Sequence, residues 1–167
     1  MRPARDLSWR DLAIVPQSLG LVEELSVREN IALPLRLSGG RAGAMSDPRV
    51  DALLHALGLA ELADRAPFEV SIGEQQRTAI ARALVVQPRL LVADEPTGHQ
   101  DADWAHGVFR ALREAAGAGT ACLVATHNQE AVKYMHRVLE IRDGRLGALT
   151  PAPAPEPGPS WAGGGGR

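Results

Sequence analysis

The chain has 167 residues, a formal net charge of −2 and a hydrophobic content of 45%. This length supports one domain with a substantial core, and the charge provides no broad basic field for nucleic acid. Because no apolar stretch approaches the length of a membrane span and no charged-then-apolar leader opens the sequence, we expect a cytoplasmic protein that reaches a membrane only through a partner.

The first elements are predicted to be a short strand and a capped helix. Residues Leu12–Val15 read as a strand, which a proline ends directly before Gln17. Ser26 and Glu29 form the capping-box pattern of a helix N-terminus. Pro34 is expected to kink or end that helix.

More helical segments follow an exposed loop at Ser38–Asp47. Pro48 suits the first turn of a helix that Gly58 ends, and a shorter helix spans roughly Ala60–Arg65. Residues 18–69 are therefore expected to form a helical insert between two strands of the core.

A serine-glycine turn opens the next helix at Ser71. Ser71 and Glu74 form a second capping box, with Gly73 between them. A capped helix N-terminus with a nearby glycine offers free N–H groups and the positive end of the helix dipole. Such a turn is therefore suited to binding a phosphate.

An apolar run, Leu90–Ala93, ends in the acidic pair Asp94 and Glu95. A buried parallel strand of this kind delivers a charge to the carboxyl edge of its sheet. The alternative is a surface Asp-Glu pair that merely follows a core strand. Asp101, a few residues later, is expected to cap the next helix, whose apolar side includes Trp104.

A second apolar strand is predicted at Thr120–Thr126, with His127 at its carboxyl end. The strand is expected to be buried, and Cys122 within it to be a small buried hydrophobe. A lone histidine at a strand end usually has a structural role. A helix is predicted from Asn128 to about His136.

The final part combines a hairpin with a tail rich in Pro and Gly. Val138–Ile141 and Arg145–Leu149 read as two strands around an Asp143-Gly144 turn. From Thr150 the composition cannot bury a core, and it predicts a disordered or extended tail.

Residues 70–101 closely resemble the ATP-binding-cassette ATPases, the motor subunits of ABC transporters. The stretch VSIGEQQRTAIARALVVQPRLLVADEPTGHQD carries the signature turn, the acidic strand end (Walker B) and the D-loop in the order of that family. VPQSLGLVEELSVRENIALPL and ATHNQEAV resemble its Q-loop and H-loop. The similarity is greatest to the group that serves lipoprotein-release and macrolide-export machines, and it covers residues 12–149.

This resemblance implies a catalytic site for ATP and Mg²⁺. Asp94 would hold Mg²⁺ through a water, and Gln17 of the Q-loop would reach both the metal ion and the attacking water. Glu95 would polarise that water, and His127 of the H-loop would contact the γ-phosphate.

The resemblance also implies that the signature turn and the D-loop contact ATP bound to the other subunit of a dimer. The residues that match those contacts are Ser71, Gly73, Glu74, Gln75 and Asp101. The family pattern Leu-Ser-Gly-Gly is altered here, with Val70 in place of Leu and Ile72 in place of the first Gly. Ile72 disfavours positive φ and crowds a close backbone approach, which predicts a weakened or reshaped site.

The sequence contains no Gly-x-x-x-x-Gly-Lys-Ser/Thr, the Walker A loop that wraps phosphates in this fold. Lys133 is the only lysine, and no Gly-rich loop precedes it. The family places the loop before the Q-loop, but only sixteen residues precede Gln17. The first core strand is expected to be missing with it, which would leave a buried edge unpaired beside the strand that ends at His127. A reading frame that starts upstream, a decayed gene copy and a real subunit that works through a complete partner are the three possible explanations.

We therefore expect an α/β fold: a partial P-loop NTPase (RecA-like) parallel sheet with an inserted α-helical subdomain, without the first core strand and the Walker A loop. Residues 1–149 would form the partial ATPase domain. Within it, 18–69 would be the helical insert and 70–149 the core with the signature, Walker B, D-loop and H-loop. Residues 150–167 would form the tail.

The function implied by the resemblance is that of the ATP-hydrolysing subunit of an ABC transporter. Its partners would be a transmembrane permease and a second ATPase subunit in a head-to-tail homodimer or heterodimer, without nucleic acid. It would lie on the inner face of the cell membrane, and the chain by itself is expected to be inactive. One alternative is a non-catalytic regulatory or docking subunit that uses the helical insert. Another is a cassette ATPase of DNA repair or translation, although the long insertions or tandem cassettes usual there do not occur in this sequence.

Overall fold

The computed structural model describes residues 8–38, 44–98, 101–147 and 150–151. The chain divides into two compact units, Met1–Asn128 and Gln129–Arg167. The first unit holds all of the residues that the sequence marked as site candidates. Within the described ranges, no helix combines the length and the apolarity needed to cross a membrane.

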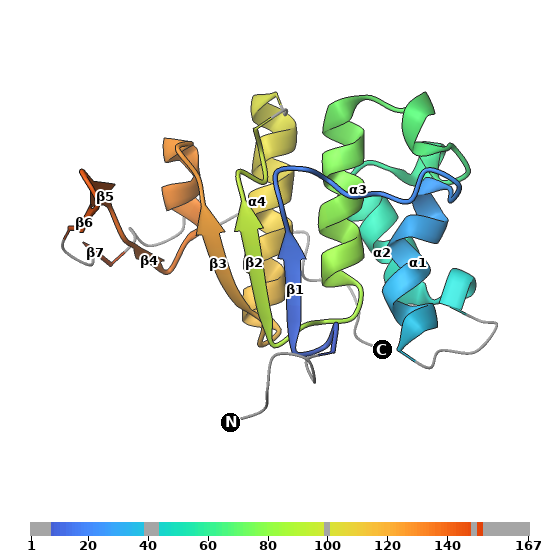
Figure 1. The fold of residues 1–167 in the computed structure, drawn as a ribbon, viewed down its shortest axis with the longest axis horizontal. Coiled ribbons are helices and arrows are strands. Elements are labelled where there is room, and N and C mark those ends of the chain that lie inside the picture. The colour runs from blue at the N-terminus through green and yellow to red at the C-terminus, as the bar shows by residue number, and fades with distance from the viewer. Residues whose placement is uncertain (1–7, 39–43, 99–100, 148–149, 152–167) are drawn as a thin grey trace, which may run out of the picture. The chain divides into compact units, whose positions relative to one another are not determined.

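The first unit is built on a three-stranded parallel sheet with the spatial order β1-β2-β3 (Figure 1). These strands are β1 (Leu12–Val15), β2 (Leu90–Asp94) and β3 (Ala121–Ala125). Val15 pairs with Ala93, and Asp94 pairs with Ala125. The three carboxyl ends therefore meet at one edge, where residues that directly follow different strands can share a site.

One face of the sheet is packed against helices α3 (Ile72–Leu84) and α4 (Ala102–Gly117). Figure 1 shows α4 behind the sheet and α3 beside β1. Alternate strand residues point to this face because side chains alternate along a strand, and among them Val15 and Leu91 are fully buried. Phe109 of α4 packs into the same core. The core of the first unit thus lies on one side of the sheet.

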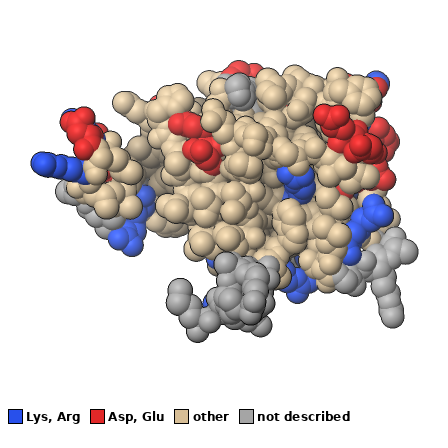
Figure 2. Space-filling view, in the orientation of Figure 1, with Lys and Arg blue, Asp and Glu red and all other residues tan. Residues whose placement is uncertain are grey.

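The opposite face of the sheet is apolar and largely exposed in the first unit. Ile14 and Leu123 are 56% and 57% exposed, and Leu90 is 38% exposed. In Figure 2 few charged side chains occupy the middle of this view. Parallel sheets usually have both faces covered, which explains why their strands read as continuous apolar runs. In the first unit, the described residues leave the second face bare.

This exposed face corrects the prediction of a buried third strand. β3 forms as expected and is an edge strand of the sheet, but its residues are exposed or half-buried. Cys122 is half-buried as well, and burial raises the pKa of its thiol. The prediction of burial was wrong because apolarity shows that a strand can be covered, not that anything covers it.

In the part of the helical insert that the structure describes, there are two α-helices and three short 3₁₀ turns. They are α1 (Val27–Leu37), η2 (Ala44–Ser46), α2 (Pro48–Ala56), η3 (Ala60–Leu62) and η4 (Pro67–Glu69). The capping box of α1 is confirmed, since the Ser26 hydroxyl accepts a hydrogen bond from the backbone N–H of Glu29 and the Glu29 carboxylate accepts one from that of Ser26. Asp47 caps α2, which Gly58 follows with a left-handed φ of +64°, as a helix end favours.

Two predictions for the insert are narrowed by the structure. Of the two outcomes expected at Pro34, a kink or an end of the helix, the second does not occur, because Pro34 lies inside α1 and the helix continues to Leu37. The predicted helix at Ala60–Arg65 is only the 3₁₀ turn η3. Residues 39–43 of the predicted loop lie outside the described residues.

The described residues of the second unit form a 3₁₀ helix and short strand pairs. Its elements are η5 (Gln129–Tyr134), β4 (Arg137–Val138), β5 (Ile141–Arg142), β6 (Arg145–Leu146) and β7 (Thr150–Pro151). β5 and β6 pair around Asp143 and Gly144, whose φ angles of +50° and +72° fit a two-residue hairpin turn. The predicted turn at Asp143-Gly144 is thus confirmed, but the paired strands are shorter than predicted, and Val138 belongs to β4, which pairs with β7. The helix predicted from Asn128 to about His136 is present as the shorter 3₁₀ helix η5. Leu149 and the tail beyond Pro151 lie outside the described residues.

The one-sided core predicts different responses from two leucines on neighbouring strands. Leu91→Ala removes a side chain that is 0% exposed and should lower the free energy of unfolding by about 2–5 kcal/mol. Leu123→Ala, at a position that is 57% exposed, should change it by no more than about 0.5 kcal/mol. Urea unfolding followed by circular dichroism measures both. Equal losses in the two variants would show that the second face is covered in solution.

Candidate functional site

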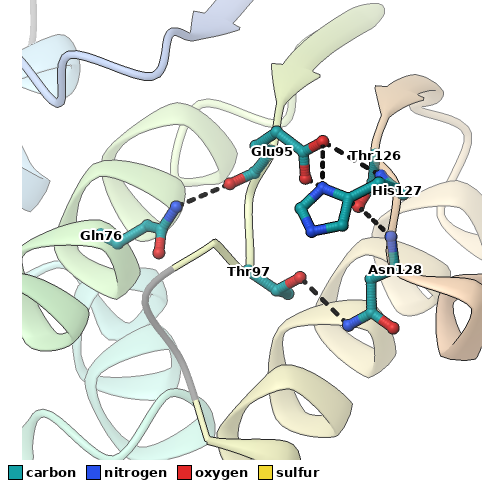
Figure 3. A network of polar contacts seen from close by, with 6 residues as sticks. All are labelled: Gln76, Glu95, Thr97, Thr126, His127 and Asn128. Atoms are coloured by element: carbon teal, nitrogen blue, oxygen red, sulfur yellow. Dashed lines mark hydrogen bonds and ion pairs between the residues drawn. The ribbon is translucent and has the colours of Figure 1, made fainter.

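The carboxyl edge of the sheet carries a carboxylate-imidazole pair, Glu95 and His127 (Figure 3). Glu95 follows β2, and His127 stands two residues beyond the end of β3. Glu95 Oε1 lies 2.7 Å from His127 Nδ1 and also accepts a hydrogen bond of 3.0 Å from the backbone N–H of His127. Glu95 Oε2 accepts one of 3.0 Å from the hydroxyl of Thr126. Both carboxylate oxygens of Glu95 are thus tied to the end of β3.

The backbone of Glu95 is held in a sparsely populated conformation. Its φ of +46° is left-handed, which costs a non-glycine residue of the order of 1–3 kcal/mol. The N–H of Glu95 donates to the carbonyl of Ala125 at 2.8 Å, and the amide of Gln76 donates to the carbonyl of Glu95 at 2.8 Å. The surroundings therefore fix the direction in which the Glu95 side chain leaves the strand.

The environment of Glu95 favours its ionised form. Burial opposes ionisation, but hydrogen bonds from His127 and Thr126 outweigh it and hold the pKa of Glu95 below its ordinary value. An ionised carboxylate only accepts hydrogen bonds, so Nδ1 of His127 carries the shared proton and donates it. This assignment leaves Nε2 of a ring that is 86% exposed for contact with a ligand.

Sequence reasoning missed four residues of the network around this pair, namely Gln76, Thr97, Thr126 and Asn128. Gln76, Thr126 and Thr97 all take part in the network, Thr97 by accepting a long hydrogen bond of 3.5 Å from the amide of Asn128. The hydroxyl of Thr126 also accepts a hydrogen bond of 3.1 Å from the backbone N–H of Asn128. Thr126 directly precedes His127, which was the available signal for its role. Gln76 offered no local signal, because its contact joins residues 19 positions apart.

Gln17 and Asp94 lie at the same edge but outside this network. Asp94 is the last residue of β2, and Gln17 stands two residues beyond the end of β1; both are exposed. Among the described residues, neither side chain bonds to another site candidate. In the same ranges, no group of three or more His, Cys, Asp or Glu side chains is arranged to hold a metal ion.

The serine-glycine turn at the start of α3 is closed on itself. Ser71 Oγ accepts a hydrogen bond of 3.3 Å from the backbone N–H of Glu74. In return, Glu74 Oε2 accepts a hydrogen bond of 2.7 Å from the backbone N–H of Ser71 and one of 2.9 Å from its hydroxyl. The amide of Gln75 turns back to the carbonyls of Pro67 and Val70, at 2.9 and 3.3 Å. The side chains of Glu74 and Gln75 therefore stabilise the turn, which confirms the predicted capping box.

The remaining candidate residues lie at the starts of α3 and α4. Gly73 is buried, and the substituted Ile72 is 51% exposed in the first turn of α3. Asp101 caps α4 as predicted, because its carboxylate accepts a hydrogen bond of 3.0 Å from the backbone N–H of Trp104. From the second turn of α3, the amide of Gln76 donates a hydrogen bond to the carbonyl of Glu95 and so connects this helix to the Glu95 pair.

The last turn of α3 holds the segment that follows Gln17. The Arg82 guanidinium donates to the carbonyls of Leu19 and Gly20 at 2.9 and 2.8 Å. Burial lowers the pKa of Arg82, which remains charged far above neutral pH. Through Arg82 and Gln76, one helix is bonded to the segments that follow β1 and β2.

The comparisons with known proteins agree with this arrangement. The profile of the ABC transporter family matches residues 3–98. The lipoprotein-releasing system ATP-binding protein LolD of Maricaulis maris is 46% identical over 144 residues, which cover 86% of this chain and 62% of that protein. LolD 1 of Rhodospirillum rubrum is 44% identical over 145 residues, 85% of this chain and 63% of that protein. The chain thus spans less than two thirds of these relatives.

Solved structures with the same fold are ABC cassettes. A dimeric ATP-binding cassette in a post-hydrolysis state, bound to ADP and Pi, has a TM-score of 0.74 at 28% identity, over 87% of this chain and 65% of that one. A second dimeric bacterial ABC transporter cassette has a TM-score of 0.69 at 32% identity, with the same coverage. These similarities confirm the predicted partial P-loop NTPase fold.

The network around Glu95 predicts a pH dependence of stability. A carboxylate whose pKa is depressed on folding contributes stability that is present above its unfolded pKa and lost as pH falls through the folded value. Unfolding free energy of the native sequence should therefore decline below about pH 4.5, the ordinary value for a glutamate, and Glu95→Gln should flatten part of this decline. Urea unfolding at several pH values between 3 and 7 measures it.

His127→Ala serves as the graded comparison for this measurement. It removes the Nδ1 contact but keeps the backbone N–H and the Thr126 hydroxyl. Its pH profile should lie between those of the native sequence and Glu95→Gln. A Glu95→Gln profile parallel to the native one would contradict a lowered pKa at this residue.

Proposed function

Because this chain belongs to the ABC transporter family and is similar to lipoprotein-releasing ATP-binding proteins, we propose that it forms part of an ATP-hydrolysing subunit that powers a membrane transporter. The observation that carries the proposal is the Glu95–His127 pair, which stands beside the exposed Asp94 where parallel strands end. A carboxylate, an imidazole and a free acid at this edge match the needs of phosphoryl transfer to water.

Four residues at this edge would each have a role in ATP hydrolysis. Asp94 would hold Mg²⁺ through a water, with Gln17 reaching the same ion and the attacking water. Glu95 would accept a hydrogen bond from that water and orient it. Because hydrogen bonds hold the pKa of Glu95 below its ordinary value, its carboxylate would be ionised and able to accept that hydrogen bond. His127 would direct Nε2 toward the γ-phosphate of ATP.

The fit of these residues to Mg²⁺ and ATP is partial. Asp94 offers an exposed carboxylate of the kind that Mg²⁺ prefers. No Gly-rich loop with a lysine occurs in the sequence, so these residues do not supply the N–H groups and the charge that wrap a triphosphate. We propose that the phosphate-wrapping loop comes from residues outside this sequence, on the same polypeptide or on a partner.

The second proposed surface faces another ATPase subunit. Ser71, Gly73, Glu74, Gln75 and Asp101 would contact a nucleotide held by that subunit, in a head-to-tail homodimer or heterodimer. The solved cassettes with this fold are dimeric, which supports the assembly. The helical insert at 18–69 would dock on a transmembrane permease, while 70–149 would form the nucleotide-binding core. The protein would lie on the inner face of the cell membrane.

A non-catalytic docking subunit is the alternative that two observations favour. The phosphate loop does not occur in the sequence, and Ile72 is 51% exposed where the family pattern has a glycine. Retention of the Glu95–His127 pair with its supporting hydrogen bonds favours the catalytic origin. Turnover and association assays distinguish the two functions.

The first expected result is that the purified chain by itself hydrolyses no ATP, because it lacks the phosphate-wrapping loop. A coupled assay of phosphate release with Mg-ATP measures this. Turnover that disappears in Glu95→Gln would show that the present residues are sufficient for catalysis, contrary to the proposal.

The second expected result is association with a complete cassette, such as the Maricaulis maris relative, that requires Mg-ATP and is abolished by EDTA. Sedimentation velocity measures it. Ser71→Ala should weaken this association, whereas Ser26→Ala, which removes the same kind of capping box from α1, should not. Association that is equally strong without nucleotide would favour the docking subunit, and no association would contradict the proposed ATP-hydrolysing subunit.

A further inference from the structure

The side chain of Trp104 joins three helices of the first unit. Its ring lies over the Arg77 guanidinium of α3, with 4.1 Å between the Arg77 Cζ and the ring centroid. The ring also lies next to Gly58, which follows α2. A β-carbon at Gly58 would lie only 1.9 Å from Cη2 of Trp104. The absence of a side chain at Gly58 therefore makes room for the indole ring.

Arg77 carries a positive charge that interacts with the first turn of α3 and with the N-cap of α4. Its side chain is buried, with 4% exposure. Burial lowers the pKa of Arg77, and the charges of Glu74 and Asp101 oppose that effect. Glu74 closes the capping box of α3, and Asp101 caps α4. The guanidinium thus attracts the capping carboxylates of both helices, while an aromatic face contacts it.

Trp104 connects this charge to the backbone of α4. The backbone N–H of Trp104 donates a hydrogen bond of 3.0 Å to the carboxylate of Asp101. The ring and the capping aspartate therefore belong to the same turn of helix. The ring contact with Arg77 and the capping bond to Asp101 therefore connect α3 with the first turn of α4.

We propose that Arg77 and Trp104 are positioning residues that hold the Asp101 turn at a fixed spacing from the Ser71–Glu74 turn. This inference rests on the proposed function, in which both turns contact one nucleotide on a second subunit. The fixed spacing lets a single docking event satisfy both turns, since neither has to be ordered separately. Gly58 extends the same coupling to the helical insert.

Amide hydrogen exchange of the purified chain tests the coupling without any nucleotide. Trp104→Leu removes the aromatic face, and Gly58→Ala displaces the ring without removing a polar group. Each should accelerate exchange at the first turns of both α3 and α4 by about tenfold, and leave α1 unchanged, because local opening is set by local contacts. A merely destabilised fold would accelerate α1 by the same factor.

Gly144→Ala is the matched control for Gly58→Ala. Its φ of +72° imposes nearly the same backbone strain as the +64° of Gly58, but a β-carbon there meets no atom within 4 Å. It should leave both turns at the native exchange rate. The coupling is overturned if Trp104→Leu accelerates the first turn of α4 alone, or if Gly58→Ala and Gly144→Ala behave alike.

The Mg-ATP-dependent association with a complete cassette supplies the functional part of the test. Trp104→Leu should raise the Mg-ATP concentration at half-maximal association by about tenfold, and Trp104→Phe, which keeps a π face, should restore most of the native value. An unchanged midpoint in Trp104→Leu would overturn the positioning role. If the native chain fails to associate, the proposed function fails, and the exchange experiment still decides whether the two turns are coupled.

Discussion

The arrangement of the candidate site depends on the polar side chains of a single buried helix, α3. Gln76 binds the carbonyl of Glu95, Arg77 contacts the ring of Trp104, and Arg82 binds two carbonyls in the segment after β1. These contacts hold parts of the chain that would otherwise be free loops. Because a packed helix is rigid, the segments that follow different strands keep a common frame of reference.

The sequence predicted the features that depend on neighbours a few residues apart. The Ser26–Glu29 and Ser71–Glu74 capping boxes each need only a spacing of three, and both formed as expected. The placement of Glu95 and His127 at one edge followed from the rule that parallel strands align their carboxyl ends. Their direct contact was not predictable, since it requires the left-handed backbone at Glu95 and the distant amide of Gln76.

The differences between prediction and structure have two physical origins. Of the two outcomes expected at Pro34, a kink or an end of the helix, the second did not occur, because tertiary packing of an apolar helix face outweighs the loss of one backbone hydrogen bond. The burial predicted for β3 was wrong for a different reason. Leu123 is compatible with a core, but burial depends on a second layer of structure, which the described residues of the first unit do not provide. Local patterns cannot report such a non-local condition.

The left-handed φ of Glu95 restricts which residues this position can accept during evolution. β-Branched residues such as Val or Thr strongly resist this conformation, whereas Gly, Asn and Asp adopt it readily. Loss of the acid through a β-branched residue would thus deform the junction of β2 with the following turn as well as remove the charge. Replacement by residues that tolerate the bend would leave the main-chain path intact, so chemistry could be lost at this position while the architecture is inherited unchanged.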